Sequence, residues 1–143
     1  MPAGRYSDGR LIIDFIAESL GLPYLSAYLD SLGANFSRGA NFATAASTII
    51  DQNVTLSEGG YSPFSLRVQL KEFLQFKQRS QLIYSRGGVF KGLMPKEEYF
   101  SKALYTVDIG QNDLTAGYFS NKSEEDFIPN AMMEFSRVIK ICI

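Results

Sequence analysis

The sequence contains no histidine and no tryptophan, and it has a single cysteine among its 143 residues. Histidine is the usual general base near neutral pH and the commonest metal ligand in proteins. These residues therefore hold no Ser-His or Cys-His catalytic pair and no His-based zinc site, and no cofactor is expected. The single cysteine, Cys142, lies in an apolar run, which predicts a small buried side chain rather than a nucleophile.

Strong charge of either sign and long apolar runs are also missing. Fourteen basic and fifteen acidic side chains leave a net charge of −1, so no nucleic-acid partner is expected. No apolar stretch approaches the ~20 residues that a membrane-spanning helix needs. Hydrophobic residues make up 45% of the chain and charged residues 20%, which is typical of one globular domain.

Helical and extended patterns alternate along the chain. Apolar spacing predicts helices over 11–20, 62–84 and 123–139, with a further short helix that starts at 95–98. Strand character is predicted for 39–43 and, as a buried strand, for 103–109. This alternation favours an α/β fold with a parallel sheet, but sheets of that kind normally contain several strands. With two strands, the sequence resembles only part of an α/β domain.

The sharpest local signal follows the second predicted strand, in the segment 108–114 (Asp-Ile-Gly-Gln-Asn-Asp-Leu). Gly110 permits a tight turn, and the Asn112 amide could donate a hydrogen bond to a developing oxyanion. Asp113 is expected to hold the loop by accepting from neighbouring backbone N–H groups. The same composition also suits an ordinary turn without any chemistry, so both interpretations stay open. Residues 44–48 form a second segment of interest, because their small side chains allow close backbone approach.

Several segments together resemble the plant GDSL esterase/lipases of the SGNH hydrolase superfamily. They are 4–15, 39–45 and 109–114, while 62–66 and 115–119 resemble the early-nodulin-like branch, which includes members with fucosidase names. The resemblance covers the whole chain in the right order. It implies an incomplete domain over residues 1–143, namely a flavodoxin-like three-layer sandwich that lacks its first strand and its C-terminal part.

The resemblance also implies a mechanism, ester hydrolysis by a Ser with an Asp-x-x-His base. Of the oxyanion donors, the family Asn corresponds to Asn112, and the family Gly of the second segment corresponds to the backbone N–H of Ala46. An added Cβ at Ala46 could disfavour the backbone conformation that a glycine would adopt. The segments with the nucleophile and the base are expected before residue 1 and beyond residue 143, so this chain alone is predicted to be inactive.

By the same resemblance we expect a secreted protein that acts on acyl or acetyl esters of small molecules, lipids or cell-wall sugars. The N-terminus carries no signal peptide pattern. Three N-glycosylation sequons are compatible with secretion, and they begin at Asn35, Asn53 and Asn121.

Two other functions are open. The chain could be a non-catalytic remnant that binds a carbohydrate or another protein, or it could complement a second fragment in trans. In either case a missing central strand would expose apolar surface, so we expect the isolated chain to be poorly stable.

Overall fold

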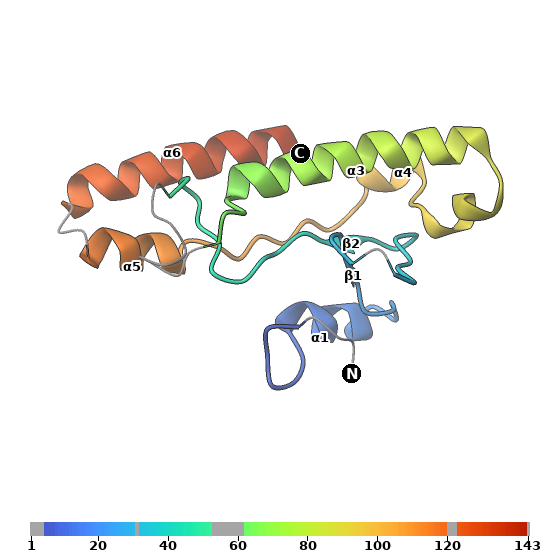
Figure 1. Ribbon diagram of the computed structural model, residues 1–143, viewed down its shortest axis with the longest axis horizontal. Helices are drawn as coiled ribbons and strands as arrows, with labels where there is room; N and C mark the ends of the chain where they lie inside the picture. Colours follow the sequence, from blue (N-terminus) through green and yellow to red (C-terminus); the bar gives the residue numbers. More distant parts are fainter. Residues whose placement is uncertain (1–4, 31, 53–61, 120–122, 143) are drawn as a thin grey trace. The chain divides into compact units, whose positions relative to one another are not determined.

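A computed structural model describes residues 5–30, 32–52, 62–119 and 123–142 (Figure 1). These residues are mostly helical and include two short parallel strands. The elements in chain order are α1 (Ile12–Ser19), β1 (Ser26–Ala27), β2 (Ala40–Asn41), α3 (Leu66–Arg86), the 3-10 helix η1 (Val89–Leu93), α4 (Glu97–Phe100), α5 (Gln111–Phe119) and α6 (Glu124–Cys142). The chain divides into two compact units, one formed by Met1–Phe42 with Leu74–Ala103 and the other by Ala43–Phe73 with Leu104–Ile143.

The first unit contains the two strands. Their register places Ser26 opposite Ala40 and Ala27 opposite Asn41. The pairing continues beyond β1, where the backbone N–H of Tyr28 donates to the carbonyl oxygen of Asn41 at 2.8 Å. The strand predicted for 39–43 is therefore confirmed at its centre, and β1 is an additional strand that the sequence pattern did not predict.

An aromatic cluster forms the interior of this unit. Phe76 of α3 is buried and lies at its centre. Ring centroids 5.4 to 6.0 Å away surround it, and they belong to Tyr28, Phe36, Phe42 and Phe100. All four pairs with Phe76 are edge-to-face, the arrangement that the ring quadrupole favours. The cluster thus packs the residues around both strands onto the C-terminal half of α3.

Helix α1 confirms the helix predicted over 11–20. It ends at Ser19, two residues before Gly21, which has a φ of 66°. Its buried face differs from the apolar stripe in the sequence, because Asp14 and Ala17 are buried while Ile12 and Phe15 are exposed. Asp14 caps the helix, since its Oδ2 accepts from the backbone N–H of Leu11 at 2.9 Å.

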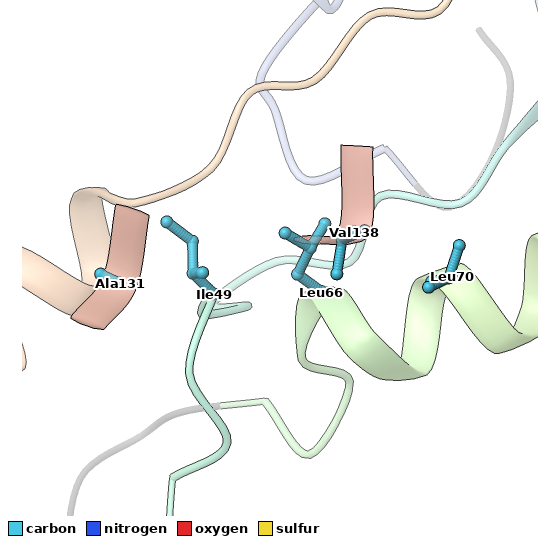
Figure 2. Close-up of a cluster of buried hydrophobic side chains, with 5 residues drawn as sticks. All are labelled: Ile49, Leu66, Leu70, Ala131 and Val138. Atoms are coloured by element: carbon cyan, nitrogen blue, oxygen red, sulfur yellow. The ribbon is translucent and has the colours of Figure 1, made fainter. Parts of the chain in front are cut away.

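The second unit is built on α5, α6 and the first turns of α3. Its core is a cluster of five buried side chains, shown in Figure 2: Ile49, Leu66, Leu70, Ala131 and Val138. Helices α3 and α6 confirm the helices predicted over 62–84 and 123–139. Cys142 is half-buried against this cluster, and burial raises the pKa of its thiol, as expected for a small core side chain.

The buried strand predicted over 103–109 is wrong. Residues 101–108 are exposed and belong to no strand in the described part of the chain, with Leu104 68% and Val107 45% exposed. A parallel strand is stable only when neighbouring strands complete its hydrogen-bond ladder and helices cover its faces. No strand of the described residues pairs with 104–107, so Leu104 and Val107 remain in solvent, while the ring of Tyr105 packs edge-to-face on Phe73 with centroids 5.6 Å apart.

Two helical elements were not predicted. The segment after Gly110 continues into α5 rather than forming an open turn, and η1 follows the glycines that end α3. The short helix predicted to start at 95–98 is confirmed as α4. None of the described helices is long and apolar enough to cross a membrane.

Candidate functional site

The residues predicted for oxyanion binding all belong to the second unit. Gly110 and Asn112 lie where the chain enters α5. Gly110 has a φ of 120°, a conformation that side chains rarely adopt. A Cβ at this position would lie 3.4 Å from Cδ1 of Ile49. The φ of Gly110 therefore allows the sharp entry into α5, while a Cβ would lie at the edge of ordinary van der Waals contact with Ile49.

Ala46 lies in that loop, between β2 and α3. Its φ is 61°, and it is the single non-glycine residue with a positive φ in the described ranges. The left-handed conformation costs an alanine about 1–2 kcal/mol, because its Cβ approaches the following carbonyl oxygen. A glycine would avoid this cost, which agrees with the family Gly that the resemblance assigns to this position.

Asn112, the second residue of α5, is linked to the same loop. Its Nδ2 donates to the carbonyl oxygen of Ser47 at 2.9 Å. A primary amide has two N–H groups, and this bond engages one of them. The structure therefore brings Asn112 beside the chain neighbour of Ala46, although 65 residues separate Asn112 from Ser47.

Asp113 does not bond the neighbouring residues of its own loop, as the sequence had led us to expect. Its Oδ2 accepts from the backbone N–H of Ile49 at 2.8 Å, and its Oδ1 accepts from that of Ile50 at 3.0 Å. The side chain is almost completely buried, with 2% exposed. The prediction that Asp113 bonds its own turn was wrong because Asp113 lies inside α5. The helix directs its carboxylate away from its own loop.

These segments border a cleft of about 180 Å³. It is lined by residues 108–112 on one side and by Ala43, Thr44, Ser47 and Gln69 on the other. Its charged side chain is Asp108, and no cationic side chain lines it within the described residues. The cleft consequently suits a neutral polar ligand better than an anion. Ala46 lies next to this lining but does not contribute to it.

Gln69 is a cleft residue that the sequence pattern did not indicate. It lies on α3, and its Nε2 donates to Oγ of Ser47 at 3.0 Å and to the carbonyl oxygen of Phe64 at 3.3 Å. Both N–H groups of its amide are thus engaged, which leaves its Oε1 as an acceptor. Nothing distinguished this glutamine in advance from the other polar residues of the predicted helix.

The sequons fall elsewhere. Asn35 is exposed, and its Oδ1 accepts from the backbone N–H of Ser37 at 3.0 Å. Asn53 and Asn121 lie outside the described residues.

Comparison with known proteins identifies relatives over the whole chain. The chain is 63% identical over 142 residues to Alpha-L-fucosidase 3 from Arabidopsis thaliana, covering 97% of this chain and 38% of that protein. It is 57% identical over 140 residues to an esterase from Hevea brasiliensis, covering 96% of this chain and 36% of that protein. It is 59% identical over 120 residues to the GDSL esterase/lipase ENOD8 from Medicago truncatula, covering 84% of this chain and 31% of that protein.

No solved structure matches the chain. The chain spans little more than a third of the length of the curated relatives it matches most fully. The GDSL-like lipase/acylhydrolase family profile matches residues 1–141. The expected resemblance is thereby confirmed, and the chain belongs to the GDSL-like lipase/acylhydrolase family.

Proposed function

We propose that this chain supplies the oxyanion-binding part of a carboxylic ester hydrolase that acts on acyl or acetyl esters. The observation that carries the proposal is the Asn112–Ser47 hydrogen bond, which ties the amide of Asn112 to the Ala46 loop at the edge of a cleft. As an attacked ester carbonyl becomes tetrahedral, its oxygen gains negative charge. The second N–H of Asn112 and the backbone N–H of Ala46 would stabilise that charge.

The nucleophile and the base belong, in this proposal, to sequence outside these 143 residues. The reaction needs a Ser hydroxyl that attacks the carbonyl and a His that takes its proton, and this chain has no histidine. The chain alone should therefore not hydrolyse esters. In the complete domain, which we take to be a three-layer flavodoxin-like sandwich, residues 104–107 would gain partner strands.

The substrate class and the compartment follow the family and the cleft. The polar lining of the cleft, with Asp108 as its charged side chain, suits an ester of a small polar molecule or a sugar, and one relative carries the name of a fucosidase. We further propose a secreted glycoprotein. The exposed position of Asn35 supports glycan attachment at that sequon.

The proposal can be tested in a chimera. In this chimera, the chain replaces the matching segment of the Hevea brasiliensis esterase, to which it is 57% identical. We expect the chimera to hydrolyse p-nitrophenyl acetate and Asn112→Ala to reduce kcat by about 10²–10³-fold. Asn130→Ala is the matched control, because Asn130 is an exposed α6 residue whose Nδ2 donates to Asp126. Equal kcat values for Asn112→Ala and the unsubstituted chimera would overturn the assignment.

The second candidate is a non-catalytic protein of this length, and the missing histidine favours it. An antibody against residues 96–109 would separate the two candidates in source tissue. A band above twice the calculated 15.9 kDa supports the hydrolase. A stable band near 15.9 kDa supports a binding protein and excludes hydrolysis by the family mechanism.

A further inference from the structure

We infer that Asp113 is the positioning residue of this site, because its carboxylate holds the Ala46 loop in the register that Asn112 requires. The inference rests on the proposed function, in which Asn112 and the backbone of Ala46 act on the same oxygen. It assigns to Asp113 no contact with substrate.

The carboxylate of Asp113 links two segments that are far apart in sequence, the first turn of α5 and the loop before α3. The two carboxylate oxygens accept from consecutive backbone N–H groups, those of Ile49 at 2.8 Å and of Ile50 at 3.0 Å. Because each oxygen serves one N–H, the carboxylate fixes both the position and the orientation of this part of the loop. The adjacent residue, Asn112, makes the third bond, to the carbonyl oxygen of Ser47.

Loss of the hydrogen bonds between Asp113 and the loop would cost substantial free energy, because the carboxylate is buried. The side chain of Asp113 is 2% exposed, so its charge depends on partners within the protein. Those partners are the two backbone N–H groups and the N-terminal end of α5, where the helix dipole favours a negative charge. Hydrogen bonds to a buried charge are among the strongest in proteins, whereas Asn112 contributes one neutral bond.

The loop itself needs such a restraint, because it passes through an unfavourable backbone conformation. Ala46 has a φ of 61°, and the loop would relax toward a commoner conformation if it were released. Ile49, which Asp113 holds by its N–H, also anchors the loop in the core cluster. With Asp113 removed, the remaining hydrogen bonds to this loop would all be neutral, among them Asn112–Ser47, Gln69–Ser47 and the bond from the backbone N–H of Leu66 to the carbonyl oxygen of Thr48 at 2.8 Å. Neutral bonds would oppose that relaxation less strongly than the bonds to the carboxylate.

The first experiment is NMR on the 143-residue chain at low temperature, with hydrogen exchange measured for the side-chain amide of Asn112 and the backbone amides of Ile49 and Ile50. Asp113→Ala should accelerate exchange at all three residues by about tenfold or more, and Asp113→Asn, which keeps one acceptor oxygen, should give an intermediate value. Glu125→Gln, an exposed substitution on α6 outside the cleft, should change none of them. Faster exchange at Ile49 and Ile50 with Asn112 unchanged would overturn the inference, since Asp113 would then stabilise the loop only.

A double-mutant cycle in the chimera gives an independent measurement if the Asp113 variants of the short chain do not fold. Asp113→Asn should reduce kcat with little change in KM, and it should add little to the loss caused by Asn112→Ala. Additive losses would contradict action through Asn112. Full activity of Asn112→Ala would instead defeat the proposed function, and the exchange experiment would still judge the role of Asp113.

Discussion

The Nδ2 atom of Asn112 lies 2.9 Å from the carbonyl oxygen of Ser47, so the first turn of α5 is bonded to the loop before α3. In this arrangement the side chain that we propose as an oxyanion donor is already oriented by one of its two N–H groups. Because this bond already fixes the orientation of the side chain, the site loses less conformational entropy when it binds a developing charge.

The first prediction concerns this bond directly. Asn112→Asp would place a carboxylate oxygen against the carbonyl oxygen of Ser47, so repulsion would replace an attraction. We expect the chimera to lose about 2 kcal/mol of unfolding free energy, measured by denaturant titration. Asn130→Asp, on the exposed face of α6, should cost less than half as much, and equal costs would contradict the role of the Ser47 bond.

The second prediction concerns the backbone at Ala46, whose φ is 61°. Ala46→Gly should raise the unfolding free energy by about 0.5 kcal/mol, because relief of the left-handed conformation exceeds the entropy that glycine adds to the unfolded chain. Ala45→Gly, at an exposed neighbour without a positive φ, should lower it by about 0.5–1 kcal/mol. Denaturant midpoints of both variants check this, and destabilisation by both would show that Ala46 is not strained.

The third prediction concerns the ion pair between Arg5 and Asp14, in the first unit. Nε of Arg5 donates to Oδ2 of Asp14 at 2.6 Å, and the Asp14 side chain is fully buried. Asp14→Asn should cost about 3 kcal/mol at neutral pH, because Arg5 would remain buried without its partner. Asp8→Asn, at an exposed position, should have no measurable effect on the unfolding free energy.

The same pair predicts a pH dependence. The hydrogen bond from Arg5 lowers the pKa of Asp14 below its ordinary value of 3.8. The unfolded chain therefore binds the proton more readily, so the contribution is complete above pH 3.8 and is lost as the pH falls through the lower folded pKa. The stability difference between the Asp14→Asn variant and the parent should shrink in acid, and a difference that is constant down to pH 2 would contradict this.

The fourth prediction concerns Glu72, a buried residue of α3. Its Oε2 has no hydrogen-bond partner in the described part of the structure, and burial raises the pKa of its carboxyl above the ordinary 4.5. The folded chain therefore binds the proton more readily, so stability falls as the pH rises from 4.5 through the raised pKa. Glu72→Gln should stabilise the chimera by about 1 kcal/mol at neutral pH. Glu125→Gln, an exposed control on α6, should not change the denaturant midpoint.

The fifth prediction concerns the isolated chain. Several large apolar side chains of the second unit are exposed, among them Leu104, Val107, Leu114, Tyr118 and Phe119. We expect the chain to bind a hydrophobic dye and to unfold at a lower temperature, over a broader range, than the chimera. A sharp thermal transition in a monomer that binds no dye would contradict this prediction, because the chain would then be stable without further sequence packed on these apolar side chains.

Local sequence determined α1, α3, α4 and α6, although it did not predict η1 or α5. The apolar spacing of α3 and α6 and the glycines after α1 and α3 are interactions among near neighbours, and each led to the observed element. The family membership also followed from sequence alone, whereas the roles of Asn112 and Ala46 stay predictions from the resemblance. The pattern over 103–109 failed for the opposite reason, since a strand exists only where other strands complete its ladder.

Tertiary structure alone decided how the site is held together. Asp113 was expected to bond its own loop, and Gln69 was one polar residue among many on a helix. Their partners are Ile49, Ile50 and Ser47, 22 to 64 residues away in the chain. Hydrogen bonds over such separations depend on how the segments pack, which no local pattern encodes, whereas a helix depends on contacts three and four residues apart.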